Sequence, residues 1–156
     1  MESTGGCRCG RLRYRFAGPF GPVANCHCGF CRRVHGAAFT TVAFVDPHGF
    51  SWSSPPEAVS RFETPLGAMR HFCGRCASPI FNFSPVLDLG ALITQSLDGV
   101  QLVPWAHVNT ESKAPWLVIG DALPQFPTWP SPEELRGLLD AHPDAWVPRR
   151  LVAPAP

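Results

Sequence analysis

The sequence has little that would direct the chain to a membrane or to nucleic acid. No apolar run approaches the roughly 20 residues that a membrane-spanning helix needs, and residues 1–10 lack the apolar core of a secretory signal. Only 16% of the 156 residues are charged and the formal net charge is +1, so no strongly basic face is available to phosphate groups. We therefore expect a cytoplasmic protein without membrane partners, and the balanced charge argues against nucleic acid as a partner.

Long helices are also scarce. The chain contains 18 prolines and 14 glycines, which interrupt regular structure and favour short elements joined by turns. Its apolar fraction of 45% is enough to fill the core of a domain of this length. The sequence shows no internal repeat, low-complexity tract or domain boundary, so we expect residues 1–156 to form one domain.

Short strands are predicted along most of the chain. Residues 11–16 alternate basic with apolar or aromatic side chains, which is typical of a half-buried strand whose arginines face solvent. Further strand candidates, separated by turn residues, are 23–27, 36–45, 50–52, 59–63, 69–72, 80–83, 91–97 and 102–108. Only residues 131–140 indicate a helix, with Ser131 as N-cap, Pro132 at the first position and Glu134 three residues after the cap. The residues thus predict a mainly β fold of short antiparallel strands with one short C-terminal helix.

The chemistry of the chain is concentrated in its cysteines. There are 7, grouped as Cys7 with Cys9, then Cys26, Cys28 and Cys31, and finally Cys73 with Cys76. An odd number excludes complete internal disulfide pairing, and in a reducing compartment such clusters are better explained as metal thiolates. Disulfides, or a redox role for the Cys-x-x-Cys pair, are the alternatives, although the βαβ pattern expected around a redox pair is missing.

Two cysteine pairs from distant parts of the chain are suited to one structural zinc ion. Such a site needs four tetrahedral ligands and leaves no open position. Cys7, Cys9, Cys73 and Cys76 provide this set, because residues i and i+2 of an extended segment point to the same side and a Cys-x-x-Cys turn resembles a zinc knuckle. Closing so long a loop should stabilise a domain with little helix.

The remaining Cys26, Cys28 and Cys31 are one ligand short of a closed site. A turn at residues 29–30 would bring the third sulfur back toward the first two. Catalytic zinc keeps three protein ligands and leaves the fourth position to water or substrate. The alternative is a closed structural site of three cysteines and one histidine. The candidates for that histidine are His27, His35, His71 and His107.

Two arginines follow the third cysteine directly. Arg32 and Arg33 suit bidentate recognition of a carboxylate, such as that of a carboxylate-bearing thiol. The alternative is that they balance the negative charge of a zinc ion bound by three thiolates. Phe39, Trp105 and Trp116 could wall a pocket, although a single aromatic side chain in a β domain more often belongs to the core.

Four segments together resemble the glutathione-dependent formaldehyde-activating enzyme family, which also includes centromere protein V. They are Gly5–Tyr14, Cys26–Arg33, Phe72–Phe81 and His107–Leu117. The resemblance covers about residues 5–127 in the right order, and the combined spacing is specific although each motif is short. The tail from residue 130 onward lies outside it.

The resemblance implies a β-tent fold, a structural zinc ion on the four cysteines and a second zinc ion on the three. It also implies a carbon-sulfur lyase of the S-hydroxymethylglutathione synthase type, which adds glutathione to formaldehyde. The second zinc would then be catalytic. Arg32 or Arg33 would hold a carboxylate of a glutathione-like thiol, which reacts with a small aldehyde. His35 and His107 are candidates for a general base by residue type alone. A zinc-stabilised binding module without chemistry is the alternative. A nucleic-acid role ranks third because the charge is balanced, and the sequence leaves the oligomeric state open.

Overall fold

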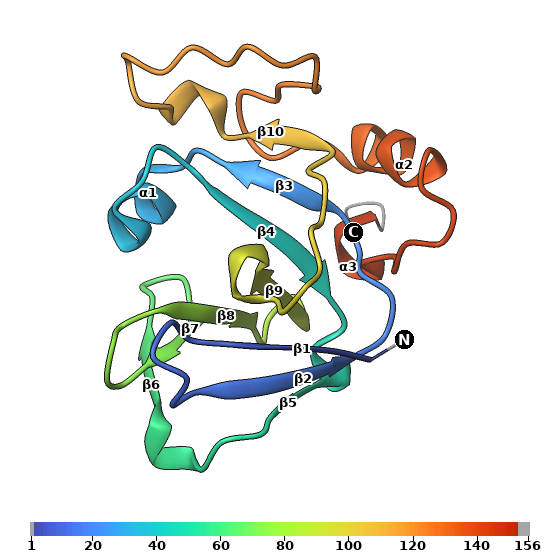
Figure 1. Cartoon of the computed structure of the whole chain (residues 1–156). Coiled ribbons are helices and arrows are strands. Elements are labelled where there is room, and N and C mark those ends of the chain that lie inside the picture. Colours follow the sequence, from blue (N-terminus) through green and yellow to red (C-terminus); the bar gives the residue numbers. More distant parts are fainter. Residues whose placement is uncertain (1, 153–156) are drawn as a thin grey trace.

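A computed structural model describes residues 2–152 as two β-sheets packed against each other, with short helices beside them (Figure 1). The smaller sheet has the order β1 (Glu2–Gly6), β2 (Arg13–Ala17), β5 (Phe50–Trp52). The larger has the order β10 (Ala106–Val108), β3 (Val23–Cys26), β4 (Thr40–Val45), β9 (Leu89–Ile93), β8 (Pro79–Ser84), β7 (Met69–Cys73), β6 (Val59–Glu63). The mainly β prediction is therefore confirmed. Neighbouring strands are antiparallel except β10 and β3, which run parallel.

The main core lies between the two sheets. The side chains of β2 alternate between buried and exposed, as its sequence predicts. Tyr14 and Phe16 are buried in this core, and Arg15 is exposed. Across the core, Phe81 of β8 stacks on Phe50 of β5 with ring centroids 4.0 Å apart. A side chain at Gly5 would collide with the hydroxyl of Tyr14, so the close approach of β1 to this ring requires glycine.

A second core covers the other face of the larger sheet. All six residues of β4 are buried, as expected for a strand covered on both faces. Val42 and Phe44 belong to this second core, where Trp129 and Trp146 of the C-terminal segment pack against them. The C-terminal segment thus forms an outer layer on the sheet that carries β3.

Three α-helices are present within residues 2–152, two more than the sequence predicted. They are α1 (Gly29–His35), α2 (Pro132–Asp140) and α3 (Arg149–Val152). Helix α2 has the predicted capping box, in which Ser131 and Glu134 satisfy each other's backbone amides. Helix α1 replaces the turn expected at residues 29–30. It escaped prediction because it is short and its N-cap is Cys28, which is not among the usual capping residues.

Other differences concern the ends of strands. Residues Thr94–Ser96 leave β9 as a 3-10 helix, and Leu97 forms an isolated bridge with Gly5. Residues 102–105 precede the short β10 without joining a sheet. Strand β1 was not predicted, since small polar residues and glycines have low strand propensity. No helix among residues 2–152 has the length and hydropathy needed to cross a bilayer.

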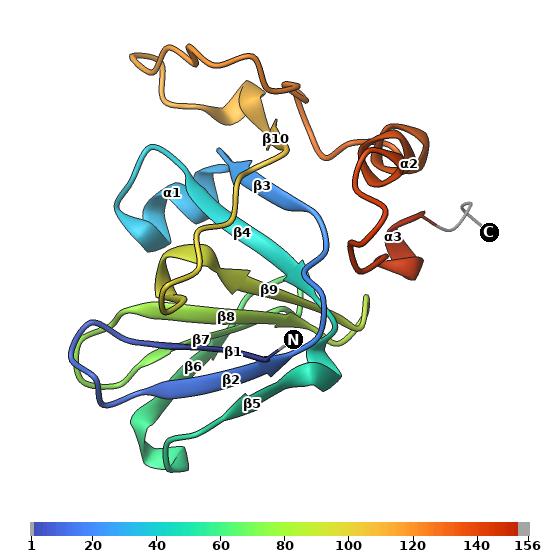
Figure 2. The same cartoon turned by 45° about the vertical axis from the view of Figure 1, so that its right-hand side comes forward.

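Two of the segments that carry cysteines, helix α1 and the loop between β1 and β2, lie on one side of the molecule. In Figure 1 and Figure 2, α1 and the loop between β1 and β2 lie on the same side, and α2 and α3 lie on the opposite side. The segments that carry cysteines are therefore separated from the C-terminal layer.

Candidate metal centres

The four-cysteine group joins the two sheets. Cys7 and Cys9 lie in the loop between β1 and β2, whereas Cys73 ends β7 and Cys76 lies in the turn before β8. The sulfur of Cys9 is 3.5 Å from that of Cys7 and 3.8 Å from that of Cys73, and all four sulfurs lie within 4.8 Å of one another. Sulfurs around a tetrahedral zinc ion are about 3.8 Å apart, given Zn–S bonds of about 2.3 Å. The spacing therefore fits a metal, and all seven cysteines are free rather than joined as disulfides.

Backbone amides point at the two buried sulfurs of this group. The amide of Leu12 donates to the sulfur of Cys7 at 3.2 Å. The amide of Arg75 donates to the sulfur of Cys73 at 3.4 Å. Such bonds stabilise thiolate ligands and fix their direction, as the predicted knuckle requires. The two loops thus make equivalent contributions from opposite sheets.

Ser78 contacts one of the two exposed sulfurs and the loop that carries the other. Its hydroxyl lies 3.2 Å from the sulfur of Cys76, and the amide of Arg8 donates to the same hydroxyl oxygen at 3.2 Å. The hydrogen bond from Ser78 lowers the pKa of Cys76 to about 5. Ser78 therefore links the two loops and favours the thiolate form of one ligand.

The three-cysteine group is built on the junction of β3 and α1. Cys26 ends β3, Cys28 is the N-cap of α1, and Cys31 lies in its first turn, where its amide donates to the sulfur of Cys28 at 3.3 Å. The three sulfurs lie within 4.8 Å of one another. Asn109, just after β10, donates from Nδ2 to the sulfur of Cys26 at 3.5 Å. Sequence reasoning placed Asn109 in the family-like segment His107–Leu117 but did not identify it as a site residue. It adopts a left-handed backbone with φ of 57°, which asparagine tolerates.

The three sulfurs share protons because three negative charges this close repel one another. The thiols of Cys26 and Cys31 donate to Cys28 and lower its pKa to about 2. The same shared hydrogen bonds raise the pKa of Cys26 and that of Cys31. A bound cation would favour full ionisation of the group, as in a thiolate metal site.

The histidines proposed as a fourth ligand have other partners. Nδ1 of His35 lies 3.4 Å from the hydroxyl of Thr40, and Nδ1 of His71 lies 3.2 Å from the carbonyl of Phe81. His27 and His107 pair with each other at 2.8 Å. Within residues 2–152, no histidine, aspartate or glutamate ligand atom completes the group of three sulfurs. The group can thus hold a metal with three protein ligands.

The two arginines differ in their surroundings. Arg32 donates from its guanidinium to the carbonyl of Ser112 at 2.5 Å, so part of its hydrogen-bonding capacity is used within the protein. Arg33 is exposed. Both line a hollow of about 430 Å³ together with Ala114 and Trp116. The remaining aromatic candidate, Trp105, stacks on His142 with centroids 3.7 Å apart and lines a different hollow.

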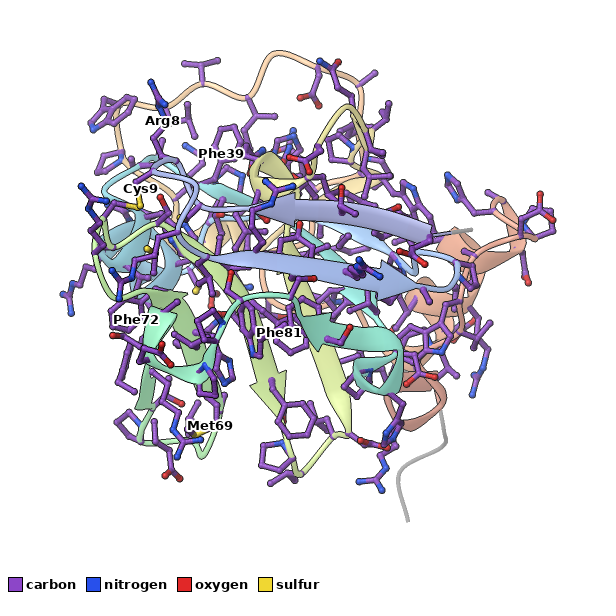
Figure 3. The ribbon with its side chains drawn as sticks, turned by 60° about the horizontal axis from the view of Figure 1, so that its bottom comes forward. Arg8, Cys9, Phe39, Met69, Phe72 and Phe81 are labelled. Atoms are coloured by element: carbon purple, nitrogen blue, oxygen red, sulfur yellow. The ribbon has the colours of Figure 1, made fainter. Side chains whose placement is uncertain are left out.

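A second hollow of about 550 Å³ is lined by residues close to each cysteine group. Cys7 and Arg8 line it from the loop between β1 and β2, and Phe39 and Thr40 line it from the segment that follows α1. Figure 3 shows Arg8 and Cys9 on the same side of the molecule as Phe39. Because Thr40 pairs with Cys26 in the sheet, this hollow reaches the strand neighbour of the three-cysteine group.

Comparison with known proteins identifies a family and a similar fold. Residues 2–111 match the family model described as glutathione-dependent formaldehyde-activating enzyme. A curated protein from Halomonas elongata, whose name describes it provisionally as a glutathione-dependent formaldehyde-activating enzyme, is 31% identical over 129 residues, covering 76% of this chain and 82% of the relative. A crystal structure of a Rhodobacter sphaeroides protein is similar in fold, with a TM-score of 0.56 and 20% identity over 66% of this chain and 99% of the other.

Proposed function

Because the chain belongs to the glutathione-dependent formaldehyde-activating enzyme family, we propose that its three-cysteine group is the centre at which a glutathione-like thiol adds to formaldehyde or a similar small aldehyde. This would make the protein a zinc-dependent carbon-sulfur lyase of the S-hydroxymethylglutathione synthase type. The observation that carries the proposal is a group of three converging sulfurs that no other protein ligand completes within residues 2–152.

The two cysteine groups would hold zinc ions with different roles. The sulfurs of Cys7, Cys9, Cys73 and Cys76 lie within 4.8 Å of one another, and four sulfurs are the number that a structural zinc ion needs. Cys26, Cys28 and Cys31 would hold the other ion. When bound there, zinc supplies an open Lewis-acid position that favours the deprotonated form of a coordinating thiol.

The reaction is an addition without any change of oxidation state. A bond forms between the thiol sulfur and the carbonyl carbon, the carbonyl π bond breaks, and the proton lost by sulfur ends on the new hydroxyl oxygen. The chain contributes positioning and charge. Asn109 orients the sulfur of Cys26, and the N-terminus of α1 favours negative charge at Cys28, its N-cap residue.

Arg33 is the better candidate for binding a carboxylate of the thiol. It is exposed and lines the hollow beside Trp116, whereas Arg32 already donates to the carbonyl of Ser112. A guanidinium binds a carboxylate through two parallel hydrogen bonds. Arg32 instead fixes α1 to the turn that follows β10.

Formation of the thiol–aldehyde adduct above its spontaneous rate tests the proposal. Exchange NMR with labelled formaldehyde and glutathione would compare the wild type with Cys31→Ser, and Val34→Ala on the exposed side of the same helix serves as a control. We expect acceleration by the wild type and by Val34→Ala, and loss of both acceleration and the second metal in Cys31→Ser. Equal acceleration by a Cys31→Ser protein that has lost the metal would refute the proposal. No acceleration by a wild type that holds both metals would favour a binding module.

A further inference from the structure

Three side chains form a hydrogen-bonded line from the surface to the segment that carries Cys26 and Cys28. The carboxylate of Asp121, whose side chain is 50% exposed, lies 3.0 Å from Nε2 of His107. Nδ1 of His107 lies 2.8 Å from Nε2 of His27. His107 is 3% exposed and His27 is 0% exposed, so only the outer end of the line meets solvent.

With both imidazole rings neutral, the hydrogen-bonding capacities of these groups fix the position of each proton. The hydrogen bond from His107 lowers the pKa of Asp121, so this carboxylate is ionised at neutral pH and can only accept. Nε2 of His107 therefore carries a hydrogen, and its Nδ1 is an acceptor. Nε2 of His27 must then be the donor between the rings. This leaves Nδ1 of His27 as a lone pair, and that buried atom has no hydrogen-bond partner within residues 2–152.

Residues 107–109 hold the segment from Cys26 to Cys28 at three points. The ring of His107 accepts from His27, and the carbonyl of Val108 accepts from the amide of His27 at 3.0 Å. Asn109 donates to the sulfur of Cys26. A displacement of the His107 ring would therefore be transmitted to two of the three sulfurs, because His27 stands between them in the chain.

Asp121 is itself held in place by a segment beyond the part of the chain that matches the family model. Its Oδ1 accepts from the amide of Leu123 at 3.0 Å. The backbone of His107 bonds to Pro124 and Phe126, each at 2.8 Å, so this segment lies along β10. The family match ends at residue 111. The outer anchor of the histidine pair is thus contributed by chain outside that match.

We propose that Asp121 is a positioning residue for the three-cysteine centre. By keeping the proton of His107 on Nε2, it holds His27 and the adjoining cysteines in the arrangement that binds the metal. This inference rests on the proposed metal role of the three cysteines. It does not depend on which thiol or aldehyde reacts.

The decisive variants are Asp121→Asn and Asp121→Glu. An asparagine amide can donate as well as accept, so two tautomers of His107 compete, whereas glutamate keeps an acceptor-only group. Asp88→Asn is a matched control, because Asp88 contacts His48 at 3.4 Å in a separate exposed aspartate–histidine pair. Long-range proton–nitrogen NMR of the zinc-loaded protein reads the histidine tautomers. Cadmium NMR with a competing chelator distinguishes the three-sulfur site from the four-sulfur site.

In the wild type and in Asp88→Asn, we expect both His27 and His107 to carry their proton on Nε2. Asp121→Asn should give mixed tautomers and lower cadmium affinity about tenfold at the three-sulfur site alone, with recovery in Asp121→Glu. Wild-type tautomers and affinity in Asp121→Asn would overturn the inference, as would an equal loss in Asp88→Asn. These measurements use no substrate, so absence of adduct formation would count against the proposed function and leave this inference standing.

Discussion

The side-chain amide of Asn109 points its hydrogen at the sulfur of Cys26 across 3.5 Å, although 83 positions separate the two residues. Asn109 occupies a left-handed backbone conformation with φ of 57°, which asparagine tolerates better than most residues. The position therefore satisfies a backbone requirement and supplies a donor to a ligand sulfur. These two contributions can be separated by substitution.

Asn109→Gly should weaken the three-cysteine metal site and leave the fold intact. Glycine adopts the left-handed conformation without cost but lacks the amide, and a lost hydrogen bond to a charged group of about 1.5 kcal/mol corresponds to roughly a tenfold loss of affinity. Asn109→Asp should weaken the site further, because it places a carboxylate beside the thiolates. Competition with a chelating dye measures both. Affinities equal to that of the wild type would show that this amide does not support the site.

Cys73→Ser should destabilise the whole protein, whereas Cys31→Ser should not. The four-cysteine group joins the two sheets, and each kcal/mol of stability lost from a protein of this size lowers the Tm by about 2–4 °C, so a drop of roughly 10 °C is expected. The three-cysteine group lies within one sheet and its adjoining helix. Thermal unfolding of both zinc-loaded variants tests this contrast, and an equal drop in Tm would contradict it. Chelation of the wild type should reproduce the larger effect.

Tyr14 should make the protein sensitive to alkali. Burial raises the pKa of Tyr14 to about 12, and Ser96 lies 2.9 Å from its hydroxyl. In the unfolded chain tyrosine ionises near about pH 10. The unfolded state therefore releases the proton first, so the stabilising contribution is complete below about pH 10 and declines as pH rises toward about 12.

The near-ultraviolet absorbance of tyrosinate reports this ionisation directly, because the chain contains 1 tyrosine. We expect its midpoint near pH 12, or at the pH of unfolding if that comes first. Tyr14→Phe should make the free energy of unfolding less dependent on pH in the alkaline range. It should also lower that free energy by about 1 kcal/mol at neutral pH. A tyrosine midpoint near that of the free residue in a folded protein would contradict the prediction.

Ser131→Ala should lower stability by about 1 kcal/mol, because it removes the side-chain half of the capping box of α2. The serine hydroxyl accepts from the amide of Glu134 at 3.2 Å, and the carboxylate of Glu134 accepts from the amide of Ser131 at 2.7 Å. Urea unfolding measures the loss. Ser131→Asp, which keeps an acceptor at the same place, should retain most of the stability, and an equal loss in both variants would argue against capping as the cause.

The sequence allowed the ligand sets to be predicted because they depend on local spacing. Two cysteines separated by one or two residues can present their sulfurs together in either local conformation; Cys7 and Cys9 do so in a turn, not in the extended segment that was expected. The separation into four and three followed from the number of ligands that a closed site needs. The structure brings the sulfurs of Cys7 and Cys9 together with those of Cys73 and Cys76. The capping box of α2 was equally predictable, since it too is a local pattern.

The surroundings of the three-cysteine group could not be predicted in the same way. Asn109 and Asp121 reach it only because β10 pairs in parallel with β3 and a later segment lies along β10. Asp121 belongs to no recognisable motif, and the family-like segment His107–Leu117, which contains Asn109, does not itself reveal that Asn109 contacts Cys26. Helix α1 was missed for a related reason, because seven residues capped by a cysteine carry too little periodicity to distinguish a helix from a turn.

The ligands of the four-cysteine group all lie within residues 7–76, whereas the residues that hold Cys26 to Cys28 in place lie within residues 107–126. During synthesis, all residues of the four-cysteine group are therefore made before the residues that hold the three-cysteine group in place. All seven thiols leave the ribosome before β10 does. The order in which the chain emerges thus completes the four-cysteine set before the residues that support the three-cysteine group are made, although the three cysteines themselves emerge before Cys73 and Cys76.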